Sequence, residues 1–276
     1  MEIKLIASDF DGTIFTGDYV DSTHPYGAIS PRTQHAIDEF KSRGGKFVLC
    51  TGRMFKSIIP FAQDMKLDGE IVAQQGAGTY DMATLQPVAR VMIPPDLLTE
   101  FLEIAEKDAW CQIYDDERYY IERKNCHSTK YAKYTHVNPT VVDMPLSEFV
   151  RRENRPFYKV YASIEGKAKD RLAAVCQERF NGRLLVSSSQ KSNIEAVSAL
   201  TSKSKALDAI AKRYGITRKH ILAFGDALND LDMIEYAGTG VAVADADPVL
   251  FETADIVTDK ACDDGVARII EELCLK

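Results

Sequence analysis

Short apolar runs that alternate with helical segments are the feature that most restricts the fold of this chain. Three such runs occur early, at 3–8, 46–50 and 70–73, and each resembles a strand buried on both faces of a parallel sheet. Segments with helical character separate them, at 31–43 and 55–65. Strand–helix–strand units join parallel strands through right-handed crossovers. The chain is therefore predicted to have an α/β fold with a doubly wound parallel sheet.

The pattern changes between residues 82 and 190, where strands pair through tight polar turns and helices no longer separate them regularly. The expected elements are a helix at 95–108, a hairpin of 111–114 with 119–121, strands at 158–164 and 184–188, and a helix at 167–180. This mixture predicts an α+β module inserted into the first domain.

After the insertion, the alternation of helix and strand resumes. The expected elements are a helix at 203–214, a strand at 221–224, a helix ending near Tyr236, strands at 241–243 and 256–258, and a closing helix at 265–273. A chain of 276 residues exceeds the size at which one core is usual. We therefore predict one domain of residues 1–81 and 191–276, with residues 82–190 as the inserted domain.

Two acidic residues follow the first expected strand. Asp9 and Asp11 lie at its carboxyl end, which is where parallel sheets bind ligands. Neighbouring carboxylates raise each other's pKa, and a hard divalent cation is the usual remedy. The alternative interpretation is an Asx-type turn in which both side chains accept backbone hydrogen bonds. The pair predicts a Mg²⁺ site.

Three other polar groups lie at strand ends or helix starts: Thr51-Gly52, Lys203, and Asp226 with Asn229 and Asp230. Singly, each has an ordinary explanation as a turn, a solvated charge, or a helix cap with first-turn acids. Together with the first acids they supply what phosphoryl transfer requires: a nucleophile, a metal, donors to the phosphoryl oxygens and a proton donor. The expected nucleophile is Asp9. Asp11 is expected to protonate the leaving oxygen and then to deprotonate water.

Four segments resemble the motifs of the haloacid dehalogenase (HAD) superfamily, in the family's order. They are Asp9–Thr13, Thr51–Arg53, Ser202–Leu207 and Gly225–Asp230. The position of the insertion and the tail Asp264–Val266 are similar to those of the Cof-type sugar phosphatases, which carry a type IIB cap. The resemblance implies a HAD-like Rossmannoid core and an α+β cap that selects the substrate.

The resemblance also implies roles for single residues. Mg²⁺ would be bound by Asp9, Asp11 and Asp226, with Asp11 contributing its backbone carbonyl. Asp230 would act on Lys203 or on a water of the metal. The groups that would hold the phosphate are Thr51, Gly52, Lys203, Asn229 and the backbone amide of Phe10.

Three positions depart from the Cof-type pattern. Ser204 stands where glycine is usual, Gln75 stands where asparagine is common, and Val243–Ala246 replaces a Met-Gly-Asn-Ala sequence. None of these changes removes a catalytic group. Gln75 is expected to alter how the substrate is recognised, and together with Arg53 it is a candidate substrate contact.

Composition excludes several classes of partner. The net charge of −7 opposes general binding to nucleic acids or anionic membranes, which requires basic surface. No apolar run approaches the ~20 residues that span a bilayer. The six cysteines show no zinc spacing, and the N-terminus lacks a signal-peptide pattern. We expect a cytoplasmic protein with reduced thiols, either a monomer or a small homo-oligomer.

Three further patterns receive ordinary interpretations. Gly238-Thr239-Gly240 follows a helix and precedes a strand, which is the reverse of a dinucleotide fingerprint. Residues 123–134 mix basic and aromatic side chains, and we interpret them as a solvated face, with steering of anionic substrates as the alternative. Asp115-Asp116-Glu117 is expected to be a turn.

The predicted function is Mg²⁺-dependent hydrolysis of small phosphate monoesters, above all sugar phosphates, through an aspartyl-phosphate on Asp9. A phosphomutase would use the same intermediate and transfer the phosphoryl group to a sugar hydroxyl. A receiver-type signalling module also combines acids, Thr, Lys and Mg²⁺ on a parallel sheet. Such a module has no second acid two residues after its nucleophile and needs no large insertion.

Overall fold

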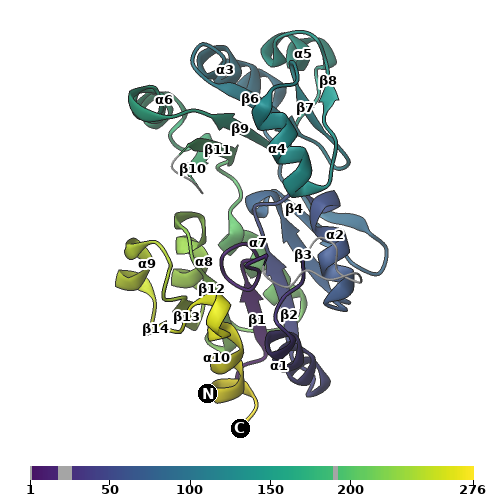
Figure 1. The fold of residues 1–276 in the computed structure, drawn as a ribbon, viewed down its shortest axis with the longest axis vertical. Coiled ribbons are helices and arrows are strands. Elements are labelled where there is room, and N and C mark those ends of the chain that lie inside the picture. The colour runs from purple at the N-terminus through teal and green to yellow at the C-terminus, as the bar shows by residue number, and fades with distance from the viewer. Residues whose placement is uncertain (1, 18–26, 189–191) are drawn as a thin grey trace.

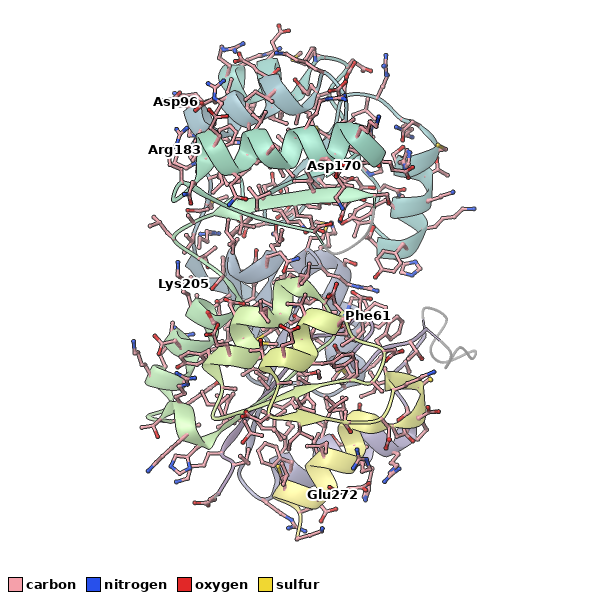
Figure 2. The ribbon with its side chains drawn as sticks, turned by 90° about the vertical axis from the view of Figure 1, so that its left-hand side faces the viewer. Phe61, Asp96, Asp170, Arg183, Lys205 and Glu272 are labelled. Atoms are coloured by element: carbon pink, nitrogen blue, oxygen red, sulfur yellow. The ribbon has the colours of Figure 1, made fainter. Side chains whose placement is uncertain are left out.

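The chain forms two lobes, each built on its own sheet, as Figure 1 shows. The computed structural model describes residues 2–17, 27–188 and 192–276. Both chain ends lie in the lower lobe, called the core below, and the upper lobe is called the cap. In the perpendicular view, Asp96, Asp170 and Arg183 lie in the cap, whereas Glu272 lies at the far end of the core (Figure 2).

The core sheet has the strand order β14-β13-β12-β1-β2-β3-β4-β5. Neighbouring strands from β14 to β3 are all parallel, which confirms the predicted α/β fold with a parallel sheet. The bounds are β1 (Leu5–Ser8), β2 (Lys46–Cys50), β3 (Glu70–Ala73), β4 (Gly78–Asp81), β5 (Gln86–Arg90), β12 (Ile221–Gly225), β13 (Thr239–Ala242) and β14 (Ile256–Val257).

Helices cover both faces of this sheet, so β1 is completely buried. One layer contains α1 packed against α10, and the other contains α7 packed against α8 and β3. The first helix begins as the sequence predicts, with Ser30 as the N-cap and Pro31 in the first turn. The bounds are α1 (Pro31–Ser42), α2 (Phe55–Asp64), α7 (Lys203–Arg213), α8 (Leu231–Tyr236), α9 (Pro248–Thr253) and α10 (Gly265–Cys274).

The core sheet reverses direction after β3, which the sequence did not predict. β4 pairs antiparallel with β3, and β5 pairs antiparallel with β4. The reversal occurs at Gln74, Gln75 and Gly76, whose φ angles of 54°, 60° and 94° all lie in the left-handed region. A connection this short cannot make a crossover, so the next strand must be antiparallel.

The cap sheet has the order β10-β11-β9-β6-β7-β8 and is antiparallel except for the pair β7–β8. Its strands are β6 (Trp110–Tyr114), β7 (Tyr119–Ile121), β8 (Thr140–Val141), β9 (Lys159–Ser163), β10 (Leu184–Ser187) and β11 (Asn193–Ser198). Its helices are α3 (Pro95–Ala105), α4 (Cys126–Thr135), α5 (Leu146–Glu153) and α6 (Gly166–Phe180).

Strand pairing corrects both predicted domain boundaries. β5 was assigned to the insertion but belongs to the core sheet, and β11 was assigned to the core but pairs with β9 and β10 of the cap. The predicted second boundary, at 190/191, lies outside the described residues. Composition does not distinguish a strand of one sheet from a strand of the other, whereas backbone pairing does. The chain leaves the core after Arg90 and returns to it after Ser198.

The cap is packed directly against the core. Met54, at the start of α2, is fully buried in a cluster with cap residues that include Tyr114, Tyr119 and Val137. The two lobes therefore share apolar surface beside the carboxyl edge of the core sheet.

The segment Asp115–Arg118 is a turn, as expected, because Oδ1 of Asp115 accepts the amide hydrogens of Glu117 and Arg118.

Candidate active site

The carboxyl ends of three neighbouring parallel strands carry polar residues predicted for the site. Asp9 follows β1, Thr51 follows β2, and Asp226 follows β12. Because β1 pairs with β2 on one side and with β12 on the other, these residues lie at one edge of the sheet. Residues from opposite ends of the chain meet there.

Lys203 reaches this edge from the first turn of α7. Ser202 caps the helix, and Gly76 approaches so closely that a Cβ there would lie 2.3 Å from the Ser202 carbonyl oxygen. This packing leaves Lys203 only 1% exposed. Its Nζ donates to Oδ1 of Asp9 at 2.6 Å and to Oδ1 of Asp230 at 2.5 Å. The structure thus brings together the lysine and the acids that the sequence singled out.

Burial and charge act against each other in this cluster. Burial would lower the pKa of Lys203, but the carboxylates of Asp230 and Asp9 hold that pKa well above its usual value. Burial strongly raises the pKa of Asp9, and Lys203 opposes the rise. Burial and then the charge of Asp230 raise the pKa of Asp226 to about 7. When all four groups are ionised, the carboxylates of Asp9, Asp226 and Asp230 carry three negative charges and the ammonium of Lys203 carries one positive charge. The cluster then has a net charge of two negative charges.

The donor set suits a hard divalent cation. Carboxylate oxygens of Asp9, Asp226 and Asp230 lie within 4.8 Å of one another. Lys203 occupies Oδ1 of Asp9, and Thr13 donates to Oδ1 of Asp226 at 2.6 Å. The second oxygen of each of these two acids accepts no hydrogen bond from any residue that the structure describes. Two oxygen ligands and two uncompensated charges match what Mg²⁺ requires.

Asp230 is held differently from the other two acids. Its Oδ1 accepts from Lys203, and its Oδ2 accepts from the backbone amides of Asp226 and Ala227, both at 3.1 Å. Hydrogen bonds therefore occupy both carboxylate oxygens of Asp230. Asp230 thus contacts both Lys203 and the loop that carries Asp226, and its role in the reaction stays a prediction.

The side chain of Asp11 is turned toward the cap. The Nε and Nη2 atoms of Arg53 donate to Oδ2 and Oδ1 of Asp11 at 2.8 and 2.6 Å, and Tyr134 donates to Oδ1 at 2.6 Å. The Asp11 carboxylate therefore lies outside the group formed by Asp9, Asp226 and Asp230. Metal binding by Asp11 was predicted through its backbone carbonyl, and that role stays a prediction.

Among the remaining predicted residues, Gly52, Gln75 and Asn229 line one cleft with Asp9. Thr51 is buried, and a Cβ at Gly52 would lie 2.7 Å from Nε2 of Gln75. Nδ2 of Asn229 donates to Oε1 of Gln75 at 3.0 Å, while Oδ1 of Asn229 is buried without a hydrogen-bond partner among the described residues. The ring of Phe10 packs in the core, so this residue has only backbone groups to offer the site.

A cleft of about 510 Å³ joins these residues to the cap. Its core side includes Asp9, Arg53 and Asp226. Its cap side was not found by sequence reasoning, and it contains aromatic and polar residues from β6, α4, β9 and β11: Trp110, His127, Lys130, Tyr131, Tyr134, Lys159, Tyr161, Ser163, Asn193 and Glu195. The cleft has the mixed aromatic and polar lining that is typical of small-molecule sites.

Residues 123–134 are largely exposed, as expected for a solvated face, and one side of helix α4 also lines the cleft. His127, Lys130, Tyr131 and Tyr134 all line the cleft. These positions recur at helical spacing and share one face of α4. The spacing was visible in the sequence, but nothing local indicates that this face meets the core.

Lys159 and Glu195 form a buried ion pair where the cap meets the core. Nζ of Lys159 lies 2.9 Å from the Glu195 carboxylate and donates to the Gly52 carbonyl oxygen at 2.8 Å. Gln75 also donates to Glu195, at 3.3 Å. Strand β9 of the cap therefore contacts the loop after β2, and β11 contacts the turn after β3. No sequence motif signals these contacts.

Comparison with known proteins identifies the family. The model of the haloacid dehalogenase-like hydrolases matches residues 6–270. The chain belongs to this family. The predicted HAD membership and the predicted hydrolase class are thereby confirmed.

Similar HAD proteins extend over the whole chain. The 5-amino-6-(5-phospho-D-ribitylamino)uracil phosphatase YcsE of Bacillus subtilis (strain 168) is 28% identical over 277 residues, covering 100% of this chain and 97% of that protein. The crystal structure of TM0651 from Thermotoga maritima is 28% identical, with a TM-score of 0.80 and coverages of 99% and 100%. The HAD subclass IIB sugar phosphatase BT4131 has the same fold, with 22% identity, a TM-score of 0.82 and 98% coverage of both chains.

Among the described residues of this HAD-family chain, no helix has both the length and the apolar character needed to cross a bilayer.

Proposed function

We propose that this protein is a Mg²⁺-dependent phosphatase that hydrolyses small phosphate monoesters, in particular sugar phosphates, through an aspartyl-phosphate on Asp9. The observation that carries the proposal is the convergence of Asp9, Lys203 and Asp226 at one edge of the core sheet. The family membership and the phosphatase names of similar proteins support the same reaction class.

Each residue of the cluster has a role in the proposed reaction. A carboxylate oxygen of Asp9 attacks phosphorus, and the bond from phosphorus to the leaving oxygen breaks. Asp11 donates a proton to that oxygen and later accepts one from the attacking water. Asp230 positions Lys203. The equatorial oxygens of the phosphoryl group are bound by Thr51, Gly52, Lys203, Asn229 and the amide of Phe10.

Mg²⁺ would be held by side-chain oxygens of Asp9 and Asp226 and by the backbone carbonyl of Asp11. When bound, it would offset the negative charge that the carboxylates and the phosphate bring together. The gathering of the Asp9, Asp226 and Asp230 carboxylate oxygens within 4.8 Å of one another supports this assignment.

The cap would exclude water and select the leaving group. Its aromatic residues in the cleft and the polar pair Lys159–Glu195 lie opposite Asp9. Arg53 and Gln75 contact both lobes and are the proposed core contacts to the substrate.

Phosphate release from a panel of substrates tests this function. The panel contains sugar phosphates, nucleotides, pyridoxal phosphate and flavin mononucleotide, each assayed with and without Mg²⁺. We expect phosphate release that depends on Mg²⁺ and is fastest with a small phosphate monoester. Isomerised sugar phosphate without phosphate release would instead indicate a mutase, and a long-lived phosphoprotein without turnover would indicate a signalling module.

We expect Mg²⁺ to stabilise the folded protein by binding the acid cluster. At a Mg²⁺ concentration of 100 times Kd, the melting temperature should rise by roughly 5 °C or more. Asp226→Asn should lose this shift, because the substitution removes a charged ligand. Differential scanning fluorimetry measures the effect, and Asp245→Asn, an exposed acid in the loop after β13, should keep it. An unchanged shift in the Asp226 variant would contradict the assignment of the metal site.

We further propose that the enzyme acts in the cytoplasm on a small phosphorylated metabolite. All six cysteines are free thiols, including the exposed Cys126 and Cys262, which suits a reducing compartment.

A further inference from the structure

The Asp11 carboxylate receives hydrogen bonds from both lobes. Arg53 of the core donates to both of its oxygens, and the hydroxyl of Tyr134, on α4 of the cap, donates to Oδ1. Tyr134 is the point at which the cap reaches Asp11, and Figure 1 shows α4 at the bottom of the cap, facing the core. Three donors aimed at one carboxylate restrict its orientation.

Arg53 is itself fixed by aromatic rings from both lobes. Its guanidinium lies 5.1 Å from the ring centre of Phe10, 5.0 Å from that of Phe61, and 4.4 Å from that of Tyr134. The Arg53 side chain is 5% exposed, so it has little freedom to follow a mobile partner. On the cap side, the ring of Tyr134 packs against the Arg53 guanidinium, and its hydroxyl donates a hydrogen bond to Asp11.

The position of Tyr134 depends on how the cap packs against the core. Helix α4 begins with a capping box between Asn125 and Ser128, and it ends at His136 in the left-handed conformation. The cap is held against the core near this helix by Met54, which is buried among cap residues. The Tyr134 hydroxyl therefore reaches Asp11 from a helix whose position is set by the packing of the cap on the core.

We propose that Tyr134 is a positioning residue, which orients the side chain of Asp11 as the base that activates water for hydrolysis of the phosphorylated Asp9. This inference rests on the proposed function and adds a cap residue to it. In this step, Asp11 accepts a proton from water while the water oxygen bonds to phosphorus. The bond from phosphorus to Asp9 breaks, its electron pair returns to the Asp9 carboxylate, and hydrogen phosphate leaves.

The proposal assigns Tyr134 to the second half of the reaction. In this half Asp11 acts as a carboxylate, and the donors from Arg53 and Tyr134 fix the direction in which that carboxylate faces. In the first half Asp11 must be protonated, so a donor to the carboxylate gives no advantage there. Dephosphorylation should therefore need the Tyr134 hydroxyl more than phosphorylation does.

Tyr134→Phe tests the inference, because it removes the hydroxyl and keeps the ring on Arg53. We expect phosphoenzyme decay to slow by about 10-fold, the usual worth of a hydrogen bond to a charged group. The acid-stable phosphoenzyme fraction during turnover should rise accordingly. The value of kcat/KM should change less than threefold, since it reports only the steps up to leaving-group release. Rapid acid quench with radiolabelled substrate measures the decay, and steady-state assays give kcat and KM.

Tyr119→Phe is the matched control. Tyr119 lies in the cap cluster that buries Met54, and its buried hydroxyl has no hydrogen-bond partner among the described residues. This variant should match wild type in kcat/KM and in phosphoenzyme decay. Wild-type decay in Tyr134→Phe would overturn the inference, and so would an equal loss in kcat/KM and in the decay rate. Failure of the proposed function would look different, because wild type itself would then form no phosphoenzyme on Asp9.

Discussion

Replacing Asp9 by asparagine is expected to abolish phosphate release. Asparagine keeps the shape of the side chain but removes the oxyanion that attacks phosphorus, so no covalent intermediate forms. Loss of a nucleophile costs roughly four orders of magnitude or more in kcat. The measurement is phosphate release from the best substrate of the panel, with an acid-quench assay for the phosphoenzyme.

The control for this variant is Asp245→Asn, which removes an exposed acid and should leave turnover unchanged. Circular dichroism and the melting temperature should show that Asp9→Asn is folded, because Lys203 keeps its second partner, Asp230. Turnover of Asp9→Asn near the wild-type rate would rule out Asp9 as the nucleophile.

Replacing Lys203 by methionine is expected to remove activity and also to weaken the fold. Methionine fills similar space but leaves Asp9 and Asp230 buried without a counter-charge. Removing one partner of a buried ion pair typically costs about 3–5 kcal/mol of unfolding free energy. Activity should be lost because the nucleophile loses the ammonium that orients it and the phosphate loses a positive ligand.

The stability loss in Lys203→Met should depend on pH. Without the ammonium, burial still raises the pKa of Asp9 in the folded state above the pKa of Asp9 in the unfolded state. Between these two pKa values, the folded state binds more protons than the unfolded state. Stability of the variant should therefore fall as pH rises through this window, and the deficit should be larger at pH 8 than at pH 5.5. Urea unfolding without Mg²⁺ at both pH values measures this difference.

Lys205→Met is the matched control, because Lys205 is exposed and lies on the same first turn of α7. Its stability should stay within about 0.5 kcal/mol of wild type, as is usual for surface positions. A Lys203 variant as stable as the Lys205 variant would show that the buried ion pairs do not hold the acid cluster together.

Most of the core side of the site could be predicted from sequence. Asp9, Thr51 and Asp226 each follow an apolar run that reads as a buried strand, and parallel strands place their carboxyl ends at one edge. Lys203 was added as a lysine at an expected helix start, because phosphoryl transfer needs donors to the phosphate and because Ser202–Leu207 resembles a HAD motif. These inferences use local patterns and one general rule of sheet geometry.

The cap side could not be predicted in the same way. The helical spacing of His127, Lys130, Tyr131 and Tyr134 was present in the sequence, yet the face that they share could have met solvent. The pair Lys159–Glu195 comes from two strands that are adjacent only because β9 pairs with β11. Packing across the whole cap decides which strands pair. The pairing cannot be predicted from any short segment of the sequence.

The sequence by itself predicted the parallel core and the acids at its edge, because hydrophobic periodicity and strand-end chemistry are local properties, and the resemblance of four motifs to the HAD superfamily predicted the family. Only the tertiary structure decided that β5 joins the core sheet, that β11 joins the cap sheet, and that Tyr134 meets Asp11. These outcomes depend on contacts between segments far apart in the chain. Periodicity shows which face of an element is apolar or polar, but not what that face will contact.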